Sequence, residues 1–172
     1  IHGNRQQILK FSEMEHPVAL QVGGSSPEEL LEASKIGVDF GYDEINLNLG
    51  CPSDRVQSGC FGAALMREPK LVFECISKIK KNLKDTKITA KCRLGVDEQN
   101  PEQSLPKFIK YLVDAGVDGV IIHARKAMLK GLSPKQNRNI PELNYRLVSQ
   151  MKNKFREIEI IVNGGISSLC SA

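Results

Sequence analysis

The sequence predicts an α/β fold, and more specifically part of a (β/α)8 barrel, from two observations. Five apolar strand segments alternate with helical or helix-bearing segments along the chain, which is typical of a parallel sheet. In a barrel the carboxyl ends of all strands converge on one mouth, whereas a doubly wound sheet concentrates its ligand site at one switch point. Polar residues that favour the barrel lie in or at the ends of all five strands: Gln21, Asn46, Asn48, Lys91, Arg93, His123 and Asn163.

The length of the chain limits how much of a barrel it can hold. A complete barrel takes about 250 residues, and this sequence has 172. That is enough for five or six of the eight βα units. The sequence begins with Ile1 rather than Met, so we expect it to be an incomplete barrel and a portion of something longer.

The individual elements follow from local patterns. Short apolar runs bounded by turn residues predict strands over residues 17–22, 44–49, 87–92, 118–123 and 157–162. Ser26 and Pro27, followed by two acidic residues, are typical of a helix start with a Ser cap and Pro in the first turn. Apolar side chains that recur on one face predict further helices over residues 70–83, 101–115 and 141–154.

The composition is that of a soluble globular protein. Hydrophobic residues make up 41% and charged residues 26% of the chain, and 24 Lys and Arg against 20 Asp and Glu give a net charge of +4. This charge permits an anionic partner without requiring one. No apolar run approaches the roughly 18 residues of a membrane span. The five cysteines are scattered and odd in number, so a reducing, cytoplasmic location is expected rather than a disulfide scaffold.

Cys51 is the cysteine whose position best suits chemistry. It follows the second predicted strand directly, between a Gly and a Pro, so its thiol is expected at the barrel mouth as a nucleophile or proton donor. The alternative is a small buried hydrophobe, the usual state of a free cysteine. Cys75 and Cys92 fall on apolar faces and are interpreted as structural. Cys51 and Cys60 lack the Cys-x-x-Cys spacing of structural zinc sites, so no metal is expected.

Three further strands end in groups that suit an anionic ligand. Lys91 lies in an apolar strand and shares a face with Arg93. An inward lysine is costly without a charged or acceptor partner, so we favour a ligand contact over an outward orientation under a helix end. His123 precedes basic neighbours and either faces an anion or is a satisfied core histidine. The turn 163–165, Asn-Gly-Gly, offers unobstructed N–H groups for a phosphate, or is an ordinary turn.

The loop over residues 124–139, here called the basic loop, contains no acidic residue. Acids are nearly as common as bases in the whole chain, so this segregation favours contact with a phosphate backbone. A solvated basic loop is the alternative. The basic residues in the loop are Arg125, Lys126, Lys130, Lys135 and Arg138.

These motifs together resemble the tRNA-dihydrouridine synthases along essentially the whole chain. The most specific segment is the Asn-Leu-Gly-Cys-Pro-Ser block at residues 48–53. Gln-Val-Gly-Gly at residues 21–24 and Phe-Gly-Ala-Ala-Leu-Met at residues 61–66 also match. The segment over residues 123–138, which includes most of the basic loop, resembles the A-type bacterial branch in particular.

The resemblance implies an FMN enzyme on a (β/α)8 barrel that uses NADPH to reduce the C5–C6 double bond of chosen uridines in the tRNA D-arm. In such enzymes the cysteine at the position of Cys51 protonates uracil C5, while reduced flavin delivers hydride to C6. The implied flavin contacts are Gln21, Lys91, His123, Asn163, Gly164 and Gly165. The implied tRNA contacts are Asn48, Lys135 and Arg138.

The family pattern also implies parts that residues 1–172 do not contain. These parts are the first barrel strand, a Gly-Arg phosphate-binding segment in the C-terminal part of the barrel, and a C-terminal helical tRNA-binding domain. Residues 1–172 are thus expected to be the central portion of one FMN-binding barrel domain, with about five βα units. We expect a monomer, and we expect the chain alone to retain FMN poorly and to leave tRNA unreduced, which flavin absorbance and dihydrouridine analysis would test.

Two other functions remain open. An FMN barrel that acts on free pyrimidines would share the flavin-facing lysine and the cysteine acid, but a free base offers no backbone for the basic loop to hold. A non-catalytic RNA-binding remnant would keep the basic surface. Intact Cys51, Lys91 and His123 argue against such a decayed site.

Overall fold

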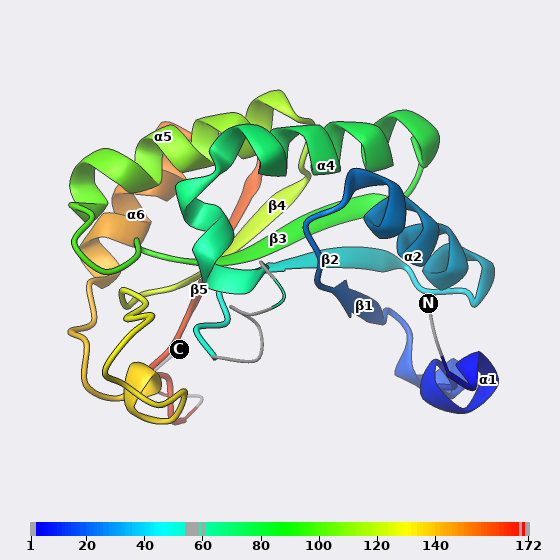
Figure 1. Ribbon diagram of the computed structural model, residues 1–172, viewed down its shortest axis with the longest axis horizontal. Coiled ribbons are helices and arrows are strands. Elements are labelled where there is room, and N and C mark those ends of the chain that lie inside the picture. The colour runs from blue at the N-terminus through cyan, green and yellow to red at the C-terminus, as the bar shows by residue number, and fades with distance from the viewer. Residues whose placement is uncertain (1–2, 54–58, 60, 169, 171–172) are drawn as a thin grey trace.

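The computed structural model describes residues 3–53, 59, 61–168 and 170 (Figure 1). Among these residues no helix has the length and apolarity needed to cross a membrane. The strands are β1 (Ala19–Val22), β2 (Glu44–Leu49), β3 (Lys87–Arg93), β4 (Gly119–His123) and β5 (Glu159–Asn163). The helices are α1 (Arg5–Ile8), α2 (Pro27–Asp39), α4 (Pro69–Asn82), α5 (Pro101–Asp114) and α6 (Tyr145–Lys154), with short 3-10 helices η1 (Glu13–Glu15), η2 (Gly62–Arg67) and η3 (Gln136–Arg138).

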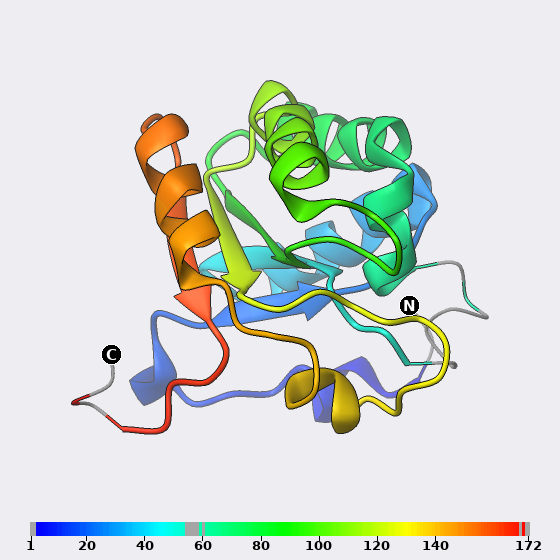
Figure 2. The same cartoon turned by 90° about the vertical axis from the view of Figure 1, so that its left-hand side faces the viewer.

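The topology of the sheet is that of a barrel. All five strands pair in parallel, and their order in the sheet is their order in the chain. Helices α2, α4, α5 and α6 lie on one side of the sheet (Figures 1 and 2). A doubly wound sheet reverses its strand order at a switch point, and the five described strands show no such reversal. The predicted barrel architecture, with five consecutive strands, is therefore confirmed.

The two faces of the sheet differ in chemistry because successive side chains of a strand point in opposite directions. On β3, Ile88 and Cys92 are fully buried and join the apolar core that the helices cover. The opposite face is polar. There Gln21 Nε2 donates to Asn46 Oδ1 at 2.7 Å, and Asn46 Nδ2 donates to Thr89 Oγ1 at 2.7 Å. This polar face is the one that a closed barrel would enclose.

The start of the last helix differs from the prediction, whereas the other boundaries agree to within two residues. The pattern predicts a helix from Pro141, but α6 begins at Tyr145. Asn144 is the N-cap, because its Oδ1 accepts the N–H of Leu147 at 2.9 Å. The backbone N–H of Asn144 donates to the carbonyl of Ala124 at 2.8 Å. The residues before α6 are thus tied to the end of β4 and form a connection rather than a first helical turn.

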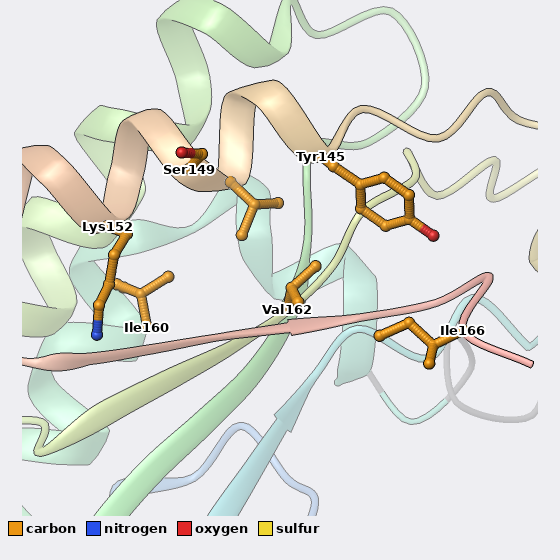
Figure 3. A pocket seen from close by; sticks show the side chains of 7 residues that line it. Tyr145, Ser149, Lys152, Ile160, Val162 and Ile166 are labelled. Atoms are coloured by element: carbon orange, nitrogen blue, oxygen red, sulfur yellow. The ribbon is translucent and has the colours of Figure 1, made fainter. Parts of the chain in front are cut away.

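An apolar hollow of about 340 Å³ lies between α6 and β5, on the helix side of the sheet (Figure 3). Because β5 is the last strand of the sheet, Val162 is left 39% exposed there. The hollow offers little chemistry, since its walls are mostly apolar and Lys152 is their one charged residue. It is lined by Tyr145, Val148, Ser149, Lys152, Ile160, Val162 and Ile166.

Gly37 is a point of close approach between α2 and the sheet, and we expect Gly37→Ala to destabilise the protein by about 1–3 kcal/mol. A Cβ there would lie 2.6 Å from Leu20 Cδ2 and 2.8 Å from Ile45 Cδ1. This overpacking outweighs the gain of about 1 kcal/mol in helix propensity. Urea unfolding followed by circular dichroism measures the change. Gly24→Ala is the control, because a Cβ there would meet Leu30 at an ordinary 3.4 Å. A more stable Gly37→Ala variant would contradict the packing.

Candidate active site

A cleft of about 670 Å³ opens at the carboxyl ends of the strands, within the range of about 300–1,000 Å³ typical of small-molecule sites. The prediction that the strand ends converge there is confirmed. The exception among the predicted site residues is Lys135, which is exposed on the basic loop and does not line the cleft. The predicted residues that line it are Gln21, Asn48, Cys51, Lys91, His123, Arg138, Asn163, Gly164 and Gly165.

Cys51 lies in a short turn after β2, residues 50–53, here called the Cys51 turn. Asn48 Oδ1 accepts two backbone N–H groups of this turn, at 3.2 and 3.1 Å. The Cys51 carbonyl accepts the N–H of Ala63 in η2 at 2.9 Å, and the thiol donates to Ser53 Oγ at 3.4 Å. The side chain is half-buried in the wall of the cleft, so the alternative of an inaccessible core cysteine does not fit.

The other cysteines have different surroundings. Burial raises the pKa of Cys75 to about 11 and that of Cys92 to about 12, so both keep their protons and are structural, as predicted. Cys170 is exposed near the end of the chain, and Cys60 lies outside the described residues. Within the described part of the chain, no three or more His, Cys, Asp and Glu side chains gather into a group that could hold a metal ion.

Lys91 and Arg93 both line the cleft, so they do not point outward under a helix end. Lys91 Nζ donates to Asn163 Oδ1 at 3.1 Å, and burial, followed by the charge of Arg93, lowers the pKa of Lys91. Arg93 is 5% exposed and donates to the carbonyls of Gly50 (3.3 Å) and Asn137 (2.7 Å). Burial lowers the pKa of Arg93 to about 10. Neither side chain pairs with a carboxylate among the described residues.

His123 is 8% exposed, and its Nε2 atom is buried with no hydrogen-bond partner among the described residues. Burial, assisted by the charges of Arg93 and Lys91, lowers the pKa of His123 to about 4. The ring is therefore neutral near pH 7. A satisfied core histidine would have a partner at this nitrogen, so the arrangement favours a ligand there.

The turn after β5 requires glycine at two positions. Gly164 and Gly165 have φ values of +95° and +76°, in the left-handed region that favours glycine. A Cβ on Gly164 would lie 2.6 Å from His123 Nε2, and one on Gly165 would lie 2.5 Å from Leu143 Cδ1. The hydroxyl of Tyr145 donates to the Gly164 carbonyl at 2.7 Å and holds the turn. Bare backbone of this kind at a cleft suits an anionic oxygen.

The basic loop is held in place by Asn137, which lies in the family-like segment 123–138 but is not among the predicted site residues. Asn137 is fully buried. Its Nδ2 donates to the carbonyls of Met128 (2.9 Å) and Leu132 (3.1 Å), and its Oδ1 accepts the N–H of Met128 at 2.7 Å. The only local signal is that Asn is common in turns, which does not distinguish a buried anchor from an exposed turn residue. This anchor keeps the adjacent Arg138 at the cleft wall.

Among the described residues the cleft carries positive charge without acidic compensation, since no described Asp or Glu lines it. Arg125 Nε, like His123 Nε2, is buried without a partner among the described residues. Unpartnered buried polar atoms and neighbouring like charges are both costly unless a ligand completes the site. The cleft is therefore suited to an anionic ligand. Its cationic lining residues are Lys91, Arg93, Arg125 and Arg138.

The sheet and the cleft define a protein of the (β/α)8-barrel class with a cationic cleft at the carboxyl ends of its strands. Comparison with protein families gives a more specific result. The family model described as Dihydrouridine synthase (Dus) matches residues 1–172. The chain belongs to the dihydrouridine synthase family.

Curated relatives agree with this assignment. The tRNA-dihydrouridine(20/20a) synthase of Synechocystis sp. is 51% identical over 97% of this chain and 50% of its own length. The enzyme of the same name from Shewanella oneidensis is 51% identical over 98% of this chain and 50% of its own length. That of Vibrio parahaemolyticus is 49% identical over 98% of this chain and 52% of its own length. The chain thus spans about half the length of the curated relatives it matches.

Neutral His123 makes the stability of the protein sensitive to acid. Its folded-state pKa of about 4 lies below the ordinary value of 6.5, so protonation favours the unfolded chain. The stability that the neutral His123 ring contributes to the folded protein is fully present above pH 6.5 and is lost as the pH falls toward 4. Between about pH 7 and 4.5 we expect the free energy of unfolding of the wild type to fall by about 2 kcal/mol more than that of His123→Gln. Urea unfolding at both pH values measures the two changes.

The control for this measurement is His16→Gln. The hydrogen bond that His16 donates to the Asp43 carboxylate raises the pKa of the exposed His16. The contribution of His16 is therefore present at low pH and is lost as the pH rises through its folded-state pKa. The two variants should therefore shift the pH dependence in opposite directions. An equal fall in the free energy of unfolding of the wild type and of His123→Gln would show that His123 does not titrate as described.

Proposed function

We propose that this protein is an FMN-dependent tRNA-dihydrouridine synthase that uses NADPH to reduce the C5–C6 double bond of uridines in the tRNA D-arm. The observation that supports it most is the meeting of Cys51, Lys91 and His123 in one cationic cleft of a member of this family. The names of the relatives specify positions 20 and 20a, and we propose the same positions here. The protein is proposed to act as a monomer in the cytoplasm.

The residues of the cleft fit FMN in two independent respects. Among the described residues His123 Nε2 has no partner and the cations of the cleft have no compensating acid there, which suits a negatively charged ligand rich in oxygen and nitrogen. The left-handed turn at residues 163–165 suits a phosphate. We propose that Gln21, Lys91, His123 and the turn 163–165 hold the cofactor. When bound, FMN supplies the hydride that adds to C6 of the uracil.

Cys51 is the proposed acid for uracil C5. Negative charge develops at C5 as C6 gains hydride, so the Sγ–H bond breaks while the new C5–H bond forms. The Cys51 turn, held by Asn48 Oδ1, keeps the thiol at the cleft wall. The thiolate left behind shares the cleft with the Arg93 guanidinium.

The basic loop is the proposed binding surface for the tRNA backbone. A uridine must leave its stack to enter a cleft of this kind, and cations around the mouth hold the phosphates while it does so. Arg138 lies on the cleft wall, and Lys135, three residues earlier in the loop, is exposed. Asn48 uses its side-chain oxygen to hold the Cys51 turn, so its amide nitrogen is the part of that side chain that could contact the base.

Two alternative functions account for less of the structure. A barrel that acts on free pyrimidines would need the flavin-facing groups but has no use for a buried anchor such as Asn137 that fixes the basic loop. An RNA-binding remnant would not need Cys51 to stay half-exposed in the same cleft as the unpartnered His123 Nε2.

The direct test uses the protein produced from its complete gene. We expect its absorption spectrum to show bound flavin. Added to tRNA from a strain that lacks this enzyme, with NADPH, it should produce dihydrouridine at positions 20 and 20a. A flavin-free protein, or reduction of free uracil without reduction of tRNA, would overturn the proposed function.

Replacement of Cys51 should separate cofactor binding from catalysis. Cys51→Ala is expected to bind FMN normally and to form dihydrouridine about 10²–10⁴-fold more slowly, the usual contribution of a general acid. Single-turnover oxidation of the reduced enzyme by tRNA measures the effect. Cys170→Ala is the matched control, since that exposed cysteine does not line the cleft. Unchanged activity in Cys51→Ala would remove Cys51 from the mechanism.

Two lysines on the same face of β3 provide a matched test of cofactor binding. Lys91 has no carboxylate partner among the described residues and lines the cleft, whereas Lys87 pairs with Glu159 at 3.2 Å and Glu44 at 3.4 Å. We expect Lys91→Met to weaken FMN binding at least about tenfold, as for a lost hydrogen bond to a charged group. Lys87→Met should bind FMN as the wild type does. Fluorescence titration with FMN measures both, and equal affinities for the two variants would contradict the role of Lys91.

A further inference from the structure

The segments that follow β2, β3 and β4 meet at Asp97. This residue lies just beyond β3, and its backbone has a φ of +45°. Within the described residues it is the one non-glycine residue with positive φ. Asp tolerates the left-handed region better than most residues, but a residue held there is fixed by its surroundings.

The carboxylate of Asp97 joins two other segments. Its Oδ1 accepts the backbone N–H of Leu129, in the basic loop, at 2.7 Å. Its Oδ2 pairs with Arg67 Nη2 at 2.8 Å. Arg67 ends η2, and Ala63 in the same helix donates to the Cys51 carbonyl at 2.9 Å. We call the contacts of the Asp97 carboxylate with Leu129 and Arg67 the Asp97 clamp.

The backbone extends the same junction. The N–H of Asp97 donates to the Ala127 carbonyl at 2.8 Å, and the N–H of Ala127 donates to the Gly95 carbonyl at 2.8 Å. The segments after β3 and β4 therefore stay paired in parallel beyond the sheet. Neither Asp97 nor Arg67 lines the cleft, so the clamp can influence the cleft only through the segments that it joins.

We propose that Asp97 is a positioning residue for tRNA binding, which fixes the basic loop relative to the Cys51 turn. This inference rests on the proposed function. The basic loop would hold tRNA phosphates while the target base reaches Cys51. The position of the basic loop relative to the Cys51 turn therefore determines whether the phosphates and the base can be bound at the same time. The proposed flavin contacts Lys91 and His123 lie on strands. Loss of the clamp therefore acts on tRNA and not on the cofactor.

Three variants of the protein made from its complete gene separate the contacts. Asp97→Gly keeps the left-handed backbone accessible and removes both carboxylate contacts. Asp97→Asn keeps an acceptor for Leu129 and loses the ion pair. Glu98→Gln is the control, because Glu98 also contacts Arg67, at 3.1 Å, without any part in the clamp. The measurements are KM for tRNA, kcat, and the rate of flavin reduction by NADPH.

We expect Asp97→Gly to raise KM for tRNA at least about fivefold while kcat and the rate of flavin reduction change less than about twofold. The KM of Asp97→Asn for tRNA should lie close to the wild-type value, and the KM of Glu98→Gln should equal it. Hydrogen exchange should show faster exchange of the Leu129 amide in Asp97→Gly alone.

Two outcomes would overturn the proposal. One is an unchanged KM for tRNA in Asp97→Gly. The other is a rise in KM accompanied by an equally large fall in kcat and in the rate of flavin reduction, which indicates general structural damage. Failure of the proposed function is distinguishable from both. A wild type that does not reduce tRNA would refute the function itself, whereas the Leu129 exchange rate still reports whether Asp97 holds the basic loop.

Discussion

The contacts of the candidate site depend on the parallel register of β3 with its neighbours. That register sets Asn48 opposite Lys91 and Arg93 opposite His123. The alternate residues of β3, such as Ile88, are fully buried on the other face. A slip of one residue would turn the charged side chains into the core and the apolar ones into the cleft. The hydrophobic core therefore does more than stabilise the chain. Because burial of its apolar side chains allows only one strand register, the core also determines where the positive charges lie.

The way in which Arg93 is buried shows how the fold tolerates those charges. Its guanidinium donates to backbone carbonyls of Gly50, Lys126 and Asn137, at 3.3, 3.3 and 2.7 Å. Carbonyl dipoles satisfy buried donors without cancelling the charge, whereas a carboxylate would neutralise the cleft and compete with an anionic ligand. The same three carbonyls belong to the Cys51 turn and the basic loop, so a single side chain satisfies its own donors and connects two functional segments.

The sequence predicts well the features that depend on local periodicity and on the common direction of parallel strands. Strand alternation places Lys91 and Arg93 on one face, and the convergence of strand ends brings Cys51 and His123 into one cleft. The start of α6 could not be predicted, because it depends on a bond between Asn144 and Ala124. The same limit applies to the roles of Asn137 and Asp97. These residues act through contacts made by irregular loops, and no periodic pattern encodes such contacts.

The contact between His123 and Gly164 links two positions that lie far apart in the chain. Any side chain at position 164 would place a carbon 2.6 Å from the imidazole, in addition to the strain of a left-handed backbone. The two residues are therefore expected to constrain each other during evolution. A lineage that retains the imidazole has no neutral path away from glycine at position 164, whereas loss of the imidazole would remove that steric barrier. In proteins with this fold, replacement of the histidine at position 123 is expected to precede replacement of the glycine at position 164.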